Sequence, residues 1–330
     1  MIKRYCIHYW CLLLLFGCQT IPLAQPRLTH VIDENYLFAC FQYLASDQLT
    51  GRKVGTKGNL QAQKYLITQL KQLNIKPFNR HYRHSFSYIN RSDQPVYGNN
   101  IVGLLPAYRH TEQYLVLTAH FDHIGKQGNN IYNGADDNAS GSAAILAILK
   151  YLTDNNLQLK HNILVIFTDG EESNLKGIKA FIQQNQPLMN QIKVNVNLDM
   201  LAGSQDSQRL HYYSKGLTKL LPPSERTYFF QQHSYQNFPV IKGFKRQLSI
   251  NNQRINWLKA SDHYAFYRQR IPFIYYGVGV HKNYHTPSDN YQNANKGLLA
   301  QSTNVIYHQL ILLDQLISNT SHNIFDHMTL

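Results

Sequence analysis

The chain has 330 residues, of which 43% are hydrophobic and 15% charged, so it can bury a full core and is not a disordered chain. Its formal net charge of +13 would suit an anionic partner, but no basic tail and no run of five like charges is present. Eleven basic and three acidic residues between 203 and 270 predict a basic rim there, and we expect no nucleic-acid partner.

The first 18 residues have the pattern of an export signal. Lys3 and Arg4 precede a short apolar stretch, residues 10–16, which cannot span a bilayer. The sequence LFGC at 15–18 resembles the lipobox of bacterial lipoproteins. We therefore expect residues 1–18 to be a signal peptide of the lipoprotein type and residues 19–34 a tether. The protein is then expected in the periplasm or outer membrane of a bacterium, anchored at Cys18, with ordinary signal-peptide cleavage as the alternative.

Apolar periodicity predicts alternating helices and strands in the rest of the chain. Residues 203–260 are less regular, with a short strand expected at 228–230. This alternation indicates an α/β three-layer sandwich with a mostly parallel central sheet flanked by helices, in a single domain of residues 35–330. The predicted helices are 35–44, 56–74, 138–152, 175–184 and 294–317, and the predicted strands are 78–89, 100–105, 113–118, 163–168, 194–198 and 271–276.

Potential metal ligands follow four of these strands. In open α/β sheets, functional groups gather at the carboxyl ends of the strands. A single His, Asp or Glu there is usually a helix cap or a solvated turn, but several together indicate a site. The candidates are His120 and Asp122 after strand 113–118, Glu171 and Glu172 after 163–168, Asp199 after 194–198, and His285 beyond 271–276.

Asp136 and Asp137 precede the predicted helix 138–152, where they could also serve as a helix start. The alternative hypothesis is that one of these two carboxylates bridges two metal ions. A set of His120, Asp136, Glu172, Asp199 and His285 would give each of two zinc ions one imidazole, one unshared carboxylate and the shared Asp136. Two imidazoles argue against calcium or magnesium, which prefer oxygen ligands.

The chain resembles the zinc-dependent exopeptidases of the bacterial leucyl aminopeptidase type, a family that includes glutamate carboxypeptidases and glutaminyl cyclases. The resemblance implies the phosphorylase/hydrolase-like zinc exopeptidase fold. It covers most of the mature chain and rests on several motifs that occur in the family's order. These motifs are GRKVGTKGN at 51–59, AHFDHIG at 119–125, NGADDNASG at 133–141, FTDGEE at 167–172, NLDM at 197–200, SDH at 261–263 and YHTPSD at 284–289.

The resemblance implies a role for each residue. Asp136 would bridge the ions, with His120 and Asp199 on one and Glu172 and His285 on the other. Glu171 would be the general base, Asp122 would orient His120, and Asp137 would support the site through a cis peptide bond with Asp136. His123 and His281 are expected to line the cleft or make structural hydrogen bonds rather than bind metal, and the SDH motif to shape the cleft wall.

The preferred function is therefore an exported di-zinc aminopeptidase, in which a metal-bound hydroxide releases the N-terminal residue of a peptide. Carboxypeptidase action, with a basic residue of 203–270 holding the substrate carboxylate, is an alternative. Glutaminyl cyclase action is a second alternative. Asp137 favours a peptidase over a cyclase, because the cyclases tend to have a small residue after the ligating Asp. A non-catalytic binding domain is the third alternative. Aromatic residues of 228–257 would favour large apolar first residues, and the sequence does not indicate an oligomeric state.

Overall fold

The computed structural model describes residues 31–233, 238–244 and 254–317. The predicted signal peptide, with Cys18, and most of the predicted tether lie outside these residues. Among the helices of the described ranges, none has the length and apolar character needed to cross a membrane.

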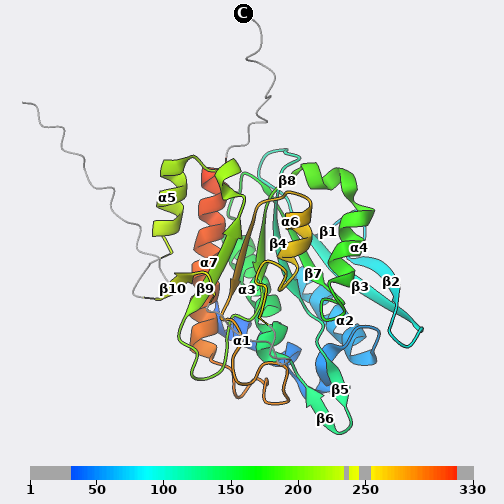
Figure 1. Cartoon of the computed structure of the whole chain (residues 1–330). Coiled ribbons are helices and arrows are strands. Elements are labelled where there is room, and N and C mark those ends of the chain that lie inside the picture. The colour runs from blue at the N-terminus through cyan, green and yellow to red at the C-terminus, as the bar shows by residue number, and fades with distance from the viewer. Residues whose placement is uncertain (1–30, 234–237, 245–253, 318–330) are drawn as a thin grey trace, which may run out of the picture.

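A nine-stranded sheet forms the centre of the molecule (Figure 1). Its strand order is β1-β3-β7-β4-β8-β11-β9-β10, with β2 paired to β3. Strands β7, β4, β8 and β11 are parallel, as predicted, whereas β3 and β9 join this group antiparallel on either side. The strands are β1 (Lys76–Pro77), β2 (Arg83–Ile89), β3 (Pro95–Leu105), β4 (Tyr114–His120), β7 (Asn162–Thr168), β8 (Ile192–Leu198), β9 (Leu210–Lys215), β10 (Val240–Lys242) and β11 (Phe273–Gly277), and a separate hairpin consists of β5 (Gly125–Gln127) and β6 (Asn130–Tyr132).

Helices cover both faces of the sheet, which confirms the three-layer arrangement (Figure 1). Because successive strand residues point to opposite faces, Leu115 and Leu117 of β4 pack into one apolar cluster and Val116 into the other. The first cluster contains residues of α1 (Glu34–Leu44), α2 (Lys57–Gln72), α3 (Gly141–Asp154), α5 (Pro223–Gln231) and α7 (Lys296–Leu316), and the second contains residues of α4 (Lys176–Gln184) and α6 (His263–Arg268).

Two predicted elements differ from the structure. Residues 228–230 lie in α5 rather than in a strand, because Pro223 is at the first turn, where a missing N–H costs nothing, and starts a helix. The helix expected to begin at 138 starts at Gly141 instead. The preceding segment, Ala135–Ser140, leaves helical geometry at Asp137 and Asn138 and places side chains at the carboxyl ends of the strands.

A buried histidine lies within an aromatic cluster between α5 and the sheet. The His233 ring stacks on Tyr212 with 4.5 Å between ring centroids. Its Nε2 lies 2.8 Å from the Tyr276 hydroxyl, and its Nδ1 lies 3.3 Å from the carbonyl oxygen of Phe229. Burial lowers the pKa of His233 from the usual 6.5 to about 4, so the imidazole is neutral in the folded protein at neutral pH.

The stability of the protein should therefore fall as the pH is lowered from 6.5 towards 4. In this range the unfolded chain binds a proton at His233 and the folded chain does not, which costs about 2 kcal/mol at pH 5. We expect His233→Phe to lose less stability between pH 7 and pH 5 than the wild type, by roughly that amount. Urea unfolding at both pH values measures the difference, with the exposed His110→Phe as control. An equal loss in His233→Phe and wild type would contradict this assignment.

Candidate metal centre

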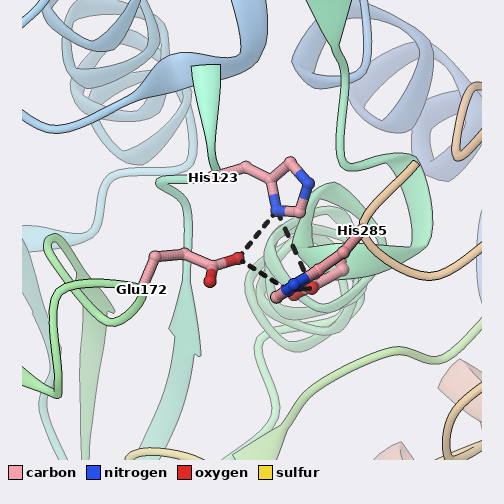
Figure 2. Close-up of side chains that lie close together, drawn as sticks. His123, Glu172 and His285 are labelled. Atoms are coloured by element: carbon pink, nitrogen blue, oxygen red, sulfur yellow. Dashed lines mark ion pairs between the residues drawn. The ribbon is translucent and has the colours of Figure 1, made fainter. Parts of the chain in front are cut away.

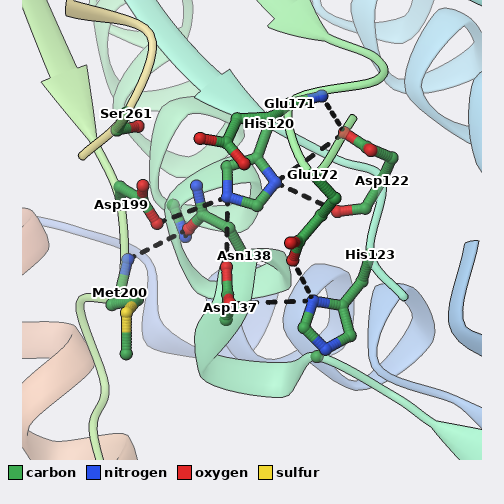
Figure 3. A network of polar contacts seen from close by, with 12 residues as sticks. His120, Asp122, His123, Asp137, Asn138, Glu171, Glu172, Asp199, Met200 and Ser261 are labelled. Atoms are coloured by element: carbon green, nitrogen blue, oxygen red, sulfur yellow. Dashed lines mark hydrogen bonds and ion pairs between the residues drawn. The ribbon is translucent and has the colours of Figure 1, made fainter. Parts of the chain in front are cut away.

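Imidazole and carboxylate side chains converge at the carboxyl ends of β4, β7 and β8, as the sequence predicted. They line a cleft of about 310 Å3, together with residues that follow β11. Figure 3 shows the polar contacts among several of these side chains, including His120, Asp137 and Asp199. Two groups of metal-ligating atoms are present among the described residues, and they share Asp137.

The first group consists of His120, Asp137 and Asp199. His120 ends β4, and its Nε2 lies 3.1 Å from Asp137 Oδ1 and 3.4 Å from Asp199 Oδ1. Its Nδ1 lies 3.0 Å from the backbone carbonyl of Asp122, which suits a neutral ring that donates from Nδ1. The Nε2 lone pair is then free to face a cation.

The second group consists of His123, Asp137, Glu172 and His285. His285 Nε2 lies 3.1 Å from Asp137 Oδ2 and 3.4 Å from Glu172 Oε1. His123 Nδ1 lies 2.9 Å from Glu172 Oε1 (Figure 2). The sequence analysis expected His123 to line the cleft or to make structural hydrogen bonds, and the structure places its Nδ1 within this group.

The spacing of these atoms fits zinc. Two ligands of one tetrahedral zinc ion, each about 2.0–2.2 Å from it, lie about 3.4 Å apart, and the distances above fall around this value. Several atoms that face the two groups are buried without a hydrogen-bond partner, which is costly unless a cation satisfies them. These atoms include His123 Nδ1, Glu172 Oε1 and Asp199 Oδ1.

The shared carboxylate belongs to Asp137, not to Asp136 as the sequence analysis expected. Asp136 points into the surrounding scaffold, where its Oδ1 accepts from the Ala202 amide at 2.7 Å and its Oδ2 lies 2.9 Å from His281 Nε2. The cis peptide bond is also one residue later than expected, between Asp137 and Asn138.

The residue after the shared Asp is therefore Asn138, which is as large as aspartate, so the argument against a cyclase now rests on Asn138.

Asp289 orients the shared carboxylate through hydrogen bonds to the backbone that carries it. Its Oδ1 accepts from the amide of Asp136 at 2.8 Å and its Oδ2 from the amide of Asp137 at 3.1 Å. Burial, with the nearby charge of Asp136, raises the pKa of Asp289 to about 6. Asp289 closes the YHTPSD motif, and the sequence analysis gave it no role.

A buried arginine holds together two loops that carry these ligands. Arg52, within the motif at 51–59, donates to the carbonyl oxygens of Phe121 at 2.6 Å, Asn133 at 2.6 Å and Gly134 at 2.9 Å, and also to that of Leu44. Burial lowers the pKa of Arg52 to about 10, but the side chain stays charged at neutral pH. The arginine therefore links the segment after β4 to the segment before Asp137.

Asp122 reaches His120 through its backbone. Its carboxylate Oδ1 is 3.8 Å from His120 Nδ1 and accepts instead from the amide of Glu171 at 3.1 Å. The expected link between Asp122 and His120 is thus present through the carbonyl oxygen, while the carboxylate positions the chain at Glu171.

Glu171 lines the cleft beside both groups but belongs to neither. Burial raises the pKa of its carboxyl well above the usual range, and the charges of Glu172 and Asp199 add to this, whereas His120 opposes it. For His120, burial lowers the pKa, but the charge of Asp199 and contact with Asp137 outweigh burial and raise it. A cation bound between these carboxylates would take the place of the proton on Nε2 and leave the ring neutral.

The SDH motif has a structural role, and no hydrolase triad is formed. Asp262 accepts from the Thr168 hydroxyl at the end of β7. His263 stacks on Tyr275 with 4.7 Å between ring centroids, and its Nε2 lies 2.9 Å from the carbonyl oxygen of Trp257. The contact with the Trp257 carbonyl holds the chain there at the cleft wall, the place expected for the motif.

The aromatic residues of 228–257 contribute less to the cleft than expected. Trp257 lines it, whereas Phe229 is buried in the core and Phe230 stacks on Tyr212. Tyr235 lies outside the described residues. The expected preference for large apolar residues therefore rests on Trp257 and on Tyr275 and Tyr284, which also line the cleft.

The sequence model of Peptidase family M28 matches residues 100–310 of the chain. A vacuolar membrane protease from Verticillium alfalfae is 34% identical over 109 residues, which cover 31% of this chain and 10% of that protein. The chain thus spans about a tenth of the length of this relative.

Solved structures of low sequence identity share the fold. The zinc aminopeptidase BSAP from Bacillus subtilis superposes with a TM-score of 0.63 at 13% identity, over 84% of this chain and 94% of that one. The glutaminyl cyclase of Porphyromonas gingivalis does so with a TM-score of 0.64 at 17% identity, over 88% of this chain and 100% of that one. The same fold is thus found in a zinc aminopeptidase and in a glutaminyl cyclase, so similarity of fold alone does not distinguish these two activities.

Proposed function

The chain belongs to peptidase family M28, and on this premise we propose that it is a zinc-dependent exopeptidase that releases the N-terminal residue of peptides. The observation that carries the proposal is the pair of donor groups joined by Asp137, with Glu171 beside them in one cleft. This arrangement provides ligands for two ions and a separate carboxylate for proton transfer.

Zinc ions held by His120, Asp137 and Asp199 and by Asp137, Glu172 and His285 would polarise the scissile carbonyl and activate water. Glu171 takes a proton from the attacking water and returns it to the leaving amine. Burial favours the protonated form of Glu171 and bound zinc ions would favour its carboxylate, so the group can both take and return a proton.

The cleft also provides hydrogen-bond donors. Burial and the nearby carboxylates raise the pKa of Tyr275 and of Tyr284, so both hydroxyls stay protonated and can donate to the substrate. The free amine of a substrate would lie against a carboxylate of this cleft or bind one of the zinc ions.

A carboxypeptidase is the second candidate, because Arg254 and Lys259 line the same cleft. A guanidinium and an ammonium group there would suit the free carboxylate of a substrate.

Blocking one end of the substrate distinguishes these activities. We expect zinc-loaded protein to cleave leucyl-p-nitroanilide, and N-acetylation of the substrate to lower kcat/KM by at least about 30-fold, because a charged contact worth about 2 kcal/mol or more is lost. Cleavage of N-acetylated dipeptides with a free carboxylate, but not of leucyl-p-nitroanilide, would contradict the aminopeptidase and support the carboxypeptidase. Conversion of glutaminyl peptides to pyroglutamyl peptides without cleavage would identify a cyclase instead.

A further inference from the structure

His123 makes the two metal-binding groups unequal. The group around His120 offers three side chains, whereas the group around His285 offers four, because His123 points into it (Figures 2 and 3). We propose that His123 Nδ1 is a fourth protein ligand of the ion held by Asp137, Glu172 and His285. This inference rests on the proposed function, because it assigns a ligand to one of the proposed zinc ions.

The distances place His123 as a ligand of this ion. Its Nδ1 is 2.9 Å from Glu172 Oε1 and 3.7 Å from Asp137 Oδ2, values on either side of the roughly 3.4 Å expected between ligands of one tetrahedral zinc ion. The His123 and His285 rings meet edge to face with 5.6 Å between centroids. Four donors thus surround one point.

A hydrogen bond to Glu172 does not account for the position of His123. Although Nδ1 and Oε1 are 2.9 Å apart, neither atom has a partner in hydrogen-bond geometry. Both are buried, and an imidazole nitrogen left unpaired in this way is costly. Two electron-pair donors at this separation that do not point at each other are what a shared cation requires.

Packing fixes the ring in this orientation. Gly134 has a φ of +55°, and a Cβ on it would lie 2.4 Å from His123 Cγ. Only a glycine therefore lets the ring lie flat against this backbone. The side chain of His123 is 0% exposed, so no solvent competes for Nδ1.

It follows that the two ions differ in their number of protein ligands and therefore in their roles. Structural zinc sites have four protein ligands, whereas catalytic sites have three and keep a position open. The ion at His123 is then held more tightly and loads first, and the ion at His120, Asp137 and Asp199 keeps the open position for the substrate.

Metal binding tests the proposal without any measurement of activity. Chelator-stripped full-length protein is titrated with Zn2+ against a chromophoric competitor. We expect two ions of unequal affinity in the wild type. His123→Ala should weaken the tighter one by more than about 100-fold, beyond the 10- to 100-fold typical of residues that only orient a ligand. His123→Gln, which can still donate to Glu172 but is a poor zinc ligand, should behave as His123→Ala.

Controls separate this inference from folding effects and from the proposed function. His110→Gln, which removes an exposed imidazole, should leave both affinities unchanged. X-ray absorption of the zinc-loaded wild type needs no variant and should count three imidazoles over two ions. Two imidazoles, or wild-type affinity in His123→Gln, would overturn the inference while leaving the peptidase intact. Absence of any bound zinc would overturn the proposed function itself.

Discussion

Asp137→Asn should strongly weaken the binding of both metal ions, whereas Asp136→Asn should retain them. Asp137 directs Oδ1 towards His120 and Oδ2 towards His285, so each oxygen serves a different group. An asparagine keeps one neutral oxygen and turns an NH2 group, which cannot bind a cation, towards the other ion. We expect zinc affinity to fall by at least about 100-fold at both sites, because a ligand lost from both ions outweighs the loss of an orienting residue.

The neighbouring residue provides a matched control. Asp136→Asn makes the same chemical change one position earlier, where Oδ1 accepts from the Ala202 amide and Oδ2 faces His281. An amide oxygen can still accept from Ala202, so we expect two bound zinc ions and a loss of stability of about 1–3 kcal/mol. Zinc content after dialysis and urea unfolding measure the two effects. Loss of zinc in Asp136→Asn but not in Asp137→Asn would show that the bridging residue is Asp136.

The regular elements could be predicted because their apolar patterns are strong. Residues 163–168 form a continuous apolar run, and β7 is buried along its whole length at the centre of the sheet. Residues 203–260 could not be predicted in this way. In α5 only Phe229 is fully buried, so its sequence carries almost no helical periodicity, and three adjacent aromatic residues resembled a strand.

The site was predictable where a strand positions the residue. His120 ends β4 and Asp199 follows β8 directly, so the sheet places both at one edge. Asp136 and Asp137 lie in a segment without a regular repeat, where contacts with Asp289 and Ala202 decide which carboxylate faces the cleft. The sequence holds no local signal for that choice.

The place of His123 could not be predicted from the sequence for the same reason. It lies beyond the end of β4, and its direction depends on Gly134 and on residues that follow β11. A histidine in a loop is more often structural than a ligand, and only the assembled structure brings its Nδ1 to Glu172. Arg52 is a further example, since its carbonyl partners come from segments far apart in the chain.

Glu171→Gln should remove catalysis while leaving the metal ions in place. Glutamine has the size of glutamate but cannot accept a proton, and Glu171 belongs to neither metal-binding group. General-base catalysis contributes typically 10²- to 10⁴-fold, so we expect kcat for leucyl-p-nitroanilide to fall by about that factor. Zinc content should remain at the wild-type level, and KM should change less than kcat, because the carboxylate acts on the proton rather than on the bound substrate.

Glu172→Gln is the paired comparison, since Glu172 follows Glu171 in the same loop after β7 and differs from it in its contacts. Its Oε1 lies within 3.4 Å of both His123 and His285, so this variant should lose zinc and, with it, activity. The two variants change adjacent residues, and we expect one to lose proton transfer and the other to lose metal binding. If Glu171→Gln lost zinc as Glu172→Gln does, Glu171 would be a ligand. If it kept wild-type turnover, the proton would have to be taken by another group.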